Sequence, residues 1–154
     1  MKKTIVLLLL ALTGFALPGN TQHIVPGERA PELKIQNWID GKVPAPAPRT
    51  YVEFFHSSCK ASAESVERLG ELSRHMGDKL RIVIIVCNDD EKAAEALRPR
   101  LSDSIGAGID PEGKLFAAYG VHYIPFGVLL GPRNRVLWMG NSRQLTPEII
   151  EKSE

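Results

Sequence analysis

The sequence predicts an α/β fold in which a mixed central sheet is flanked by helices. Residues 80–87, LRIVIIVC, form an almost unbroken apolar run rich in β-branched side chains, as in a strand covered on both faces. Before this run, Leu69, Leu72 and Met76 recur at the spacing of an amphipathic helix. After it, two short apolar runs flank the turn sequence GPRN, a pattern typical of a hairpin. The chain of 154 residues is long enough for one such domain with its own core.

The first residues predict a targeting signal. Residues 1–16 combine Lys2 and Lys3 with an apolar run that is too short to span a bilayer, followed by the small-x-small pattern Gly14-Phe15-Ala16. We interpret this segment as a signal peptide and predict an exported, periplasmic protein. The alternative is an uncleaved segment that anchors the protein to the inner membrane, facing the periplasm.

Residues 17–48 predict an extended N-terminal arm. Pro44, Pro46 and Pro48 exclude a regular helix or a central strand from its second half. Leu33, Ile35 and Trp38 are the candidate residues of a short edge strand before these prolines. The main domain is therefore expected to occupy residues 49–154.

The first half of this domain alternates strands and helices. Residues 50–56 predict a strand, and residues 59–76 predict a helix that ends at Gly77. The strand at 80–87 follows. A second helix is indicated by Ala94, Leu97 and Leu101 and is disturbed near Pro99.

The second half of the domain begins with a turn. The sequence DPEG at 110–113 favours a type I turn, and a short helix over 114–119 is expected to end at Gly120. Strands at 126–130 and 135–140 form the hairpin. Thr146 and Pro147 have the residue types that begin a last helix. The predicted order is β-α-β-α, a short helix, then β-β-α.

Cys59 is the first candidate for chemistry. It stands where the strand at 50–56 gives way to the helix, at the carboxyl edge of the sheet, where open α/β proteins bind ligands. The unpaired backbone N–H groups of the first helical turn favour a thiolate there. The polar neighbours His56, Ser58 and Lys60 argue against an inert buried cysteine. We therefore interpret Cys59 as a reactive thiol.

Two segments resemble the thioredoxin superfamily. Residues 51–72, YVEFFHSSCKASAESVERLGEL, are similar to its active-site strand and helix, and YGVHYIP at 119–125 is similar to the loop that carries its cis-proline. The segments ERAPELKIQNWIDGK and DPEGKLFAAYGV are similar in spacing to the exported TlpA-like branch of thiol-disulfide oxidoreductases. The resemblance covers roughly residues 28–150. It implies a thioredoxin-like mixed sheet flanked by helices, with Cys59 packed near Pro125.

The resemblance also implies a substrate groove beside Cys59. Its expected residues are Pro125, Ile124, His122, Ser58 and Lys60. The expected partners are protein or small-molecule thiols and disulfides.

The chain departs from the two-cysteine pattern at Ser62, where a C-x-x-C site has its second cysteine. That second thiol resolves a mixed disulfide, which a hydroxyl cannot do. The C-x-x-S variant therefore predicts monothiol exchange, with release by glutathione, another thiol or the substrate's own cysteine. This favours isomerase-like exchange or deglutathionylation.

Two other side chains are candidates to assist Cys59. Glu53 lies six residues before it, where thioredoxins carry a buried acid, which implies a raised pKa and a proton relay to the leaving sulfur. Strand alternation equally allows Glu53 to face solvent. Cys87 ends the neighbouring strand and could supply a resolving thiol, with a buried structural role as the alternative.

Two other functions are compatible with a thioredoxin-like chain of this sequence. A redox-inactive thioredoxin-like module would use the same groove to bind a peptide or protein. A peroxiredoxin-like peroxidase has a similar fold, but its reactive cysteine follows a threonine by three positions, where this chain has His56. The formal net charge of +1 offers no surface for nucleic acid. No metal site and no cofactor are expected, because ligand clusters and nucleotide motifs are missing from the sequence.

Overall fold

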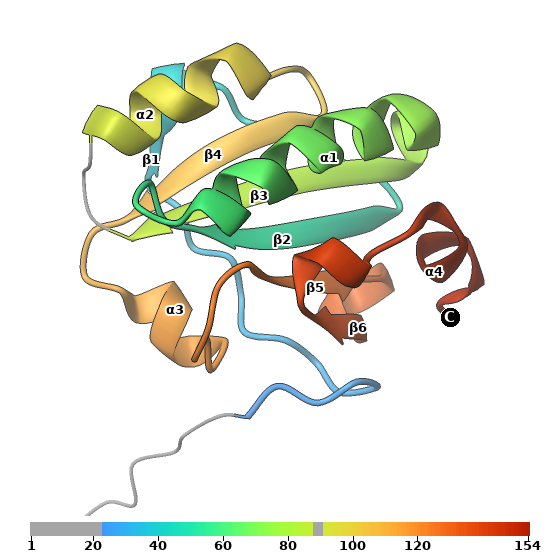
Figure 1. The fold of residues 1–154 in the computed structure, drawn as a ribbon. Coiled ribbons are helices and arrows are strands. Elements are labelled where there is room, and N and C mark those ends of the chain that lie inside the picture. The colour runs from blue at the N-terminus through green and yellow to red at the C-terminus, as the bar shows by residue number, and fades with distance from the viewer. Residues whose placement is uncertain (1–22, 88–90) are drawn as a thin grey trace, which may run out of the picture.

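The computed structural model describes residues 23–87 and 91–154 (Figure 1). The predicted signal peptide at 1–16 and the first residues of the arm lie outside the described residues. Among the helices of the described residues, none combines the length and the apolar character that a bilayer span requires.

A six-stranded sheet with the order β1-β4-β3-β2-β5-β6 forms the centre of the molecule (Figure 1). Strands β2, β3 and β4 are parallel to one another, whereas β1, β5 and β6 are antiparallel to their neighbours. This arrangement confirms the predicted mixed sheet. The strands are β1 (Asn37–Trp38), β2 (Arg49–Phe55), β3 (Leu80–Cys87), β4 (Ile105–Asp110), β5 (Phe126–Leu130) and β6 (Val136–Gly140).

Helices cover both faces of the sheet. Apolar residues of α1 and α2 and the segment leading into α4 pack on one face, and residues of α3 pack on the other (Figure 1). Alternation along β2 divides its side chains between the faces, so that Tyr51 and Phe55 lie on the α1 side while Val52 and Phe54 lie on the α3 side. The helices are α1 (Lys60–Met76), α2 (Glu91–Leu97), α3 (Lys114–Ala118) and α4 (Pro147–Lys152).

Most helix ends follow the predicted signals. Gly77 ends α1 with a φ of 58°, a conformation that favours glycine, and the Thr146 hydroxyl accepts the Ile149 N–H at the start of α4. The second predicted helix is shorter than expected. It ends at Leu97, and Pro99 lies in a separate 3₁₀ turn, because a proline cannot donate a helical hydrogen bond.

Strand β4 is missing from the order predicted above. Its sequence contains Gly106 and Gly108, and glycine has a low intrinsic preference for strands. A Cβ atom on Gly106 would lie 2.4 Å from Cδ of Pro44, and one on Gly108 would lie 2.6 Å from Cγ2 of Ile35. The two glycines thus let the N-terminal arm pack directly on the strand, a reason that local sequence does not reveal.

Candidate active site

Cys59 lies at the junction of β2 and α1. It is the N-cap of α1, whereas the predicted helix included it; its carbonyl accepts the N–H groups of Ser62 (3.0 Å) and Ala63 (3.1 Å). Its own N–H donates to the carbonyl of His56 at 3.1 Å. These bonds hold a tight turn that leaves the cysteine partly exposed.

The loop before β5 approaches the same sulfur. The Ile124–Pro125 peptide bond is cis, and Sγ of Cys59 lies 4.0 Å from the carbonyl oxygen of Ile124, the outer limit of a weak S–H···O contact. The two residues are 65 positions apart in the chain. Pro125 is buried, whereas Ile124 and Cys59 are both partly buried.

Ser62 is fully buried, and its hydroxyl accepts the backbone N–H of His56 at 3.3 Å. This bond ties the first turn of α1 to the end of β2. The side chain therefore has a structural partner. Its oxygen cannot form the disulfide that a second cysteine would form with Cys59.

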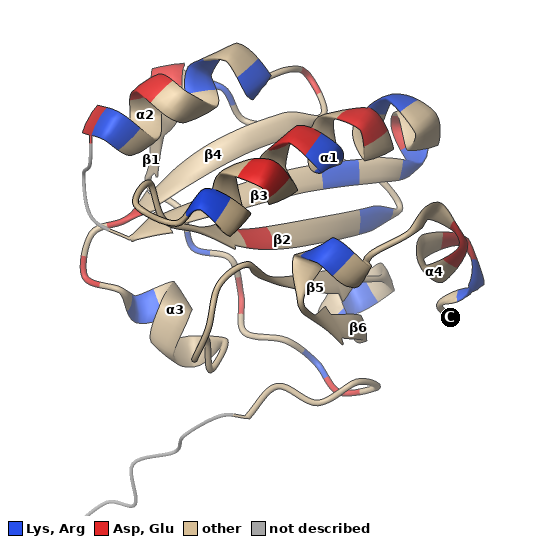
Figure 2. Ribbon diagram, viewed as in Figure 1, with Lys and Arg blue, Asp and Glu red and all other residues tan. Residues whose placement is uncertain are grey.

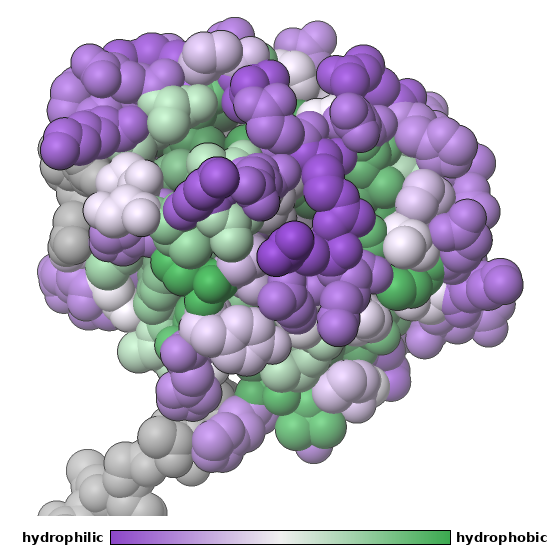
Figure 3. All heavy atoms as spheres, viewed as in Figure 1, coloured by the Kyte–Doolittle hydropathy of each residue, from purple (hydrophilic) through white to green (hydrophobic). Residues whose placement is uncertain are grey.

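The other residues predicted for the groove are exposed. Nδ1 of His56 accepts the N–H of Ser58 at 3.1 Å, and both residues are exposed. Lys60 is exposed and forms an ion pair with Glu64 at 3.9 Å. His122 is exposed on the opposite loop. A hydrophobic region lies between the first turn of α1 and α3, whereas charged residues concentrate on the helices (Figures 2 and 3).

Glu53 faces the core and not solvent, which decides between the two orientations that alternation allows. Its side chain is fully buried, and its Oε2 accepts hydrogen bonds from the hydroxyls of Tyr51 and Ser142. The other oxygen, Oε1, has no hydrogen-bond partner among the described residues. Burial raises the pKa of Glu53 to about 7, although the hydroxyls of Ser142, Ser65 and Tyr51 act in the opposite direction. Burial also raises the pKa of Tyr51, which therefore remains a donor.

The hydrogen bonds recorded for Glu53 do not reach Cys59 or Ser62. Its role as a proton relay therefore stays a prediction. Tyr51 and Ser142 were not singled out in the sequence. Tyr51 could have been found, because it lies two residues before Glu53 on the same side of the strand. Ser142 is 89 positions away and gives no local signal.

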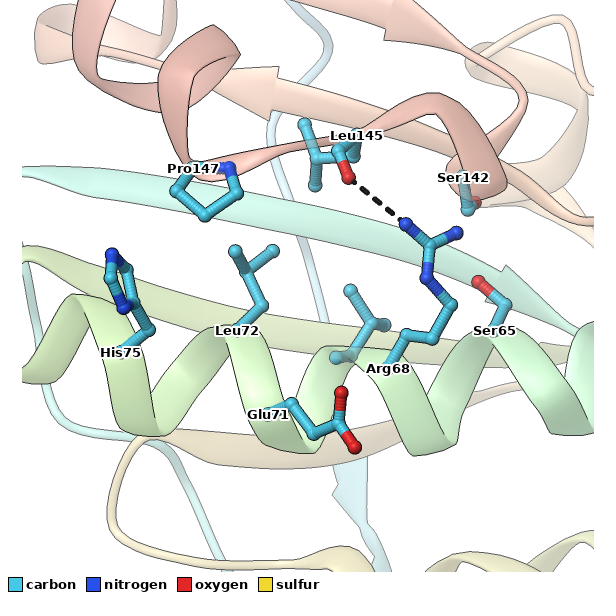
Figure 4. A pocket seen from close by; sticks show the side chains of 9 residues that line it. Ser65, Arg68, Glu71, Leu72, His75, Ser142, Leu145 and Pro147 are labelled. Atoms are coloured by element: carbon cyan, nitrogen blue, oxygen red, sulfur yellow. Dashed lines mark hydrogen bonds between the residues drawn. The ribbon is translucent and has the colours of Figure 1, made fainter.

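A pocket of about 340 Å³ opens between α1 and the segment 142–147 (Figure 4). The guanidinium group of Arg68 crosses it and donates to the carbonyls of Arg143 (2.6 Å) and Leu145 (3.4 Å). Ser65 and Ser142 lie at one end of this pocket. Residues close to the buried Glu53 therefore also line the pocket. Cys59 is not among the residues that line it.

Cys87 lies at the carboxyl end of β3, opposite Asp110 of β4, and is partly buried. Its Sγ is 3.5 Å from the position that a Cβ on Gly113 would take. Burial, and then the charge of Asp110, raise the pKa of this thiol. Alternation places Cys87 on the face of the sheet opposite α1, with Ile85. A role as resolving thiol stays a prediction, and it would require the two cysteines to approach each other from different faces.

The sheet order, the cysteine at the start of α1 and the opposing cis-proline together describe a thioredoxin-like fold, and solved structures confirm this. The thioredoxin domain of a thiol-disulfide oxidoreductase from Bacteroides vulgatus superposes with a TM-score of 0.65 at 13% identity, over 83% of this chain and 94% of that one. A thioredoxin-like protein in its oxidised form gives a TM-score of 0.62 at 16% identity, over 88% and 99%. The exposed lipoprotein thioredoxin of Streptococcus pneumoniae gives 0.52 at 18% identity, over 62% and 75%. No family model and no curated protein matches the chain.

Proposed function

We propose that this protein is an exported thiol-disulfide exchange protein in which Cys59 acts as a single reactive thiol. One observation carries the proposal: a partly exposed Sγ stands at the N-terminus of α1, 4.0 Å from the Ile124 carbonyl beside cis-Pro125. Similar solved structures include thiol-disulfide oxidoreductases and a lipoprotein thioredoxin, which supports the proposed chemistry and the proposed export. The periplasmic location rests on residues 1–16.

The proposed reaction begins with the thiolate of Cys59, which attacks one sulfur of a substrate disulfide. A bond forms between that sulfur and Cys59, and the second substrate sulfur leaves with the bonding electrons and takes up a proton. Ser62 cannot displace the captured substrate. A second thiol, from glutathione or from the substrate itself, attacks the mixed disulfide and restores Cys59. Exchange of this kind rearranges disulfides or removes glutathione without a net oxidant.

Glu53 is proposed to help with the proton that the leaving sulfur takes up. With a pKa of about 7, its carboxyl group holds a proton in part of the molecules at neutral pH. Glu53 is fully buried and accepts hydrogen bonds from Tyr51 and Ser142. Proton transfer from Glu53 would therefore have to pass through other groups or water.

The test is capture of a mixed disulfide. Reduced protein is incubated with oxidised glutathione or with a disulfide-bonded peptide, quenched with acid, and analysed by intact mass and peptide mapping. We expect one adduct on Cys59 that persists until a free thiol is added. Cys59→Ser should abolish it, and the matched variant Cys87→Ser should retain it. The absence of an adduct, or one found on Cys87 alone, contradicts the proposal.

A redox-inactive binding module is the second candidate, and the oxygen of Ser62 in place of a second sulfur is the observation that favours it. Such a module would bind an extended peptide beside Pro125 without forming a covalent bond. In the same capture experiment it would give no adduct while the peptide still bound, a result that calorimetry can detect. A peroxidase would instead form sulfenic acid on Cys59 with hydrogen peroxide.

A further inference from the structure

We propose that Tyr123 selects substrates in which an aromatic or apolar residue flanks the reacting cysteine, so that Cys59 prefers such polypeptides to glutathione. This inference rests on the proposed function and names the substrate class of the same site. It starts from a residue that the sequence did not single out.

Tyr123 is an exposed aromatic residue on the loop that carries cis-Pro125. Its side chain is 51% exposed, although large hydrophobic residues of the described chain are mostly buried. The ring packs edge-on against Phe126, with centroids 5.4 Å apart and planes at 83°. Phe126 is itself buried and packs against Phe54, with ring centroids 6.1 Å apart. One part of the ring is thus supported by the core and the rest is free, and a supported aromatic ring binds a partner at a low cost in entropy.

The position of Tyr123 relates it directly to the reaction. It precedes Ile124, whose carbonyl oxygen lies 4.0 Å from Sγ of Cys59. Tyr123 is thus the chain neighbour of the residue whose carbonyl faces the reactive sulfur, and successive Cα atoms are about 3.8 Å apart. The proposal is that a residue next to the substrate cysteine packs on the exposed part of the Tyr123 ring.

The charge distribution argues for an apolar polypeptide and against glutathione. Residues 115–132 contain no Lys, Arg, Asp or Glu, and neither do residues 54–59. The loop between α3 and β5 accordingly has neither charge colour in Figure 2. Glutathione is a net anion with a carboxylate at each end, and proteins recognise carboxylates best with cationic donors. Lys60, the neighbouring cation in sequence, is exposed and paired with Glu64.

The surface around this loop is also hydrophobic. Hydrophobic residues gather between the first turn of α1 and α3, where the loop lies (Figure 3). Within residues 23–87 and 91–154, the other large hydrophobic residues that are strongly exposed are Val25 and Val43, both in the N-terminal arm. Val43 precedes Pro44, which packs on Gly106 at the amino end of β4, away from the carboxyl edge that carries Cys59. Substitution of Val43 therefore tests whether any exposed apolar residue, even one far from Cys59, affects the reaction.

The experiment compares three mixed disulfides of 2-nitro-5-thiobenzoate: one with a peptide whose cysteine is flanked by phenylalanine, one with the same peptide flanked by serine, and one with glutathione. The Cys59 thiolate attacks the peptide or glutathione sulfur, a new disulfide forms, and coloured nitrothiobenzoate leaves with the electron pair. We expect the phenylalanine peptide to react about 3- to 10-fold faster than the other two, the size of one aromatic contact.

Substitutions then test whether the preference for the phenylalanine peptide depends on Tyr123. Tyr123→Ser should bring the ratio of the two peptide rates close to 1, Tyr123→Trp should preserve it, and Val43→Ser should leave every rate unchanged. A ratio that survives Tyr123→Ser, or glutathione as the fastest substrate, overturns the inference. Equal release from all three disulfides by the unmodified protein overturns it while the proposed function stands. No release from any of them removes the proposed function and the inference together.

Discussion

At the scale of single residues, Ser62 offers Cys59 no second thiol that could resolve a mixed disulfide. Its hydroxyl is buried in the first turn of α1 and already accepts the His56 N–H. A sulfur at the same position would lie one helical turn from Cys59, the spacing of a two-cysteine site. In this chain that position holds a hydroxyl oxygen.

If Cys59 reacts as proposed, Ser62→Cys should supply the resolving thiol of a two-cysteine site. We expect the variant to reduce insulin disulfides in the presence of dithiothreitol, measured as the onset of turbidity, because the new thiol can resolve the mixed disulfide. Ser65→Cys is the matched control, a buried serine on the same helix that is out of register with Cys59. A folded Ser62→Cys protein that is no faster than the control would count against the proposed site.

At the scale of elements, the packing of β2 against β5 depends on Gly127, which has no side chain. The two strands pair Glu53 with Gly127. The hydroxyl of the buried Tyr51 lies where a Cβ of Gly127 would be, only 1.7 Å from it. Glycine at this position is what allows the tyrosine hydroxyl to reach Glu53.

Gly127→Ala should destabilise the protein by about 1–3 kcal/mol, since a fully buried tyrosine has little room to move. Gly70→Ala is the contrasting substitution. A Cβ there would lie 3.8 Å from the nearest atom, of the Arg74 side chain, and alanine is the better helix former, so a gain of about 0.5–1 kcal/mol is expected. Urea unfolding of the two variants measures both changes. Equal effects of the two substitutions would show that the contact with Tyr51 is unimportant.

At the scale of the whole molecule, the buried Glu53 makes stability depend on pH. Its pKa is about 7 in the folded protein and near 4.5 when exposed, so the folded state binds the proton more tightly. The resulting stabilisation is complete below about pH 4.5 and is lost as the pH rises through 7. The difference corresponds to roughly 3 kcal/mol.

We therefore expect the free energy of unfolding of the unmodified protein to fall, relative to that of Glu53→Gln, by up to roughly 3 kcal/mol between pH 4.5 and pH 8. The comparison with the variant removes the contributions of other titrating groups. Denaturant unfolding at several pH values is the measurement. Parallel curves for the two proteins would mean that Glu53 titrates normally.

The elements that could be predicted are those with a strong local pattern. The helical spacing from Val66 to Met76 and the apolar run of β3 each specify their own structure, and both appear as expected. Strand β4 could not be predicted, because its glycines lower the local preference for a strand and are required only by the arm that packs on them. For the candidate site, motifs predict Cys59 and Pro125, which the structure brings close together through Ile124, whereas no motif points to Tyr123.

The sequence by itself determined the α/β class, the place of Cys59 between a strand and a helix, and the presence of a serine three positions after it, because each is expressed in the order of neighbouring residues. Only the tertiary structure decided that Glu53 faces the core with Tyr51 and Ser142, that Cys87 lies on the other face of the sheet, and that Tyr123 is exposed on a supported ring. These facts depend on contacts between distant segments and on burial, which no local pattern encodes.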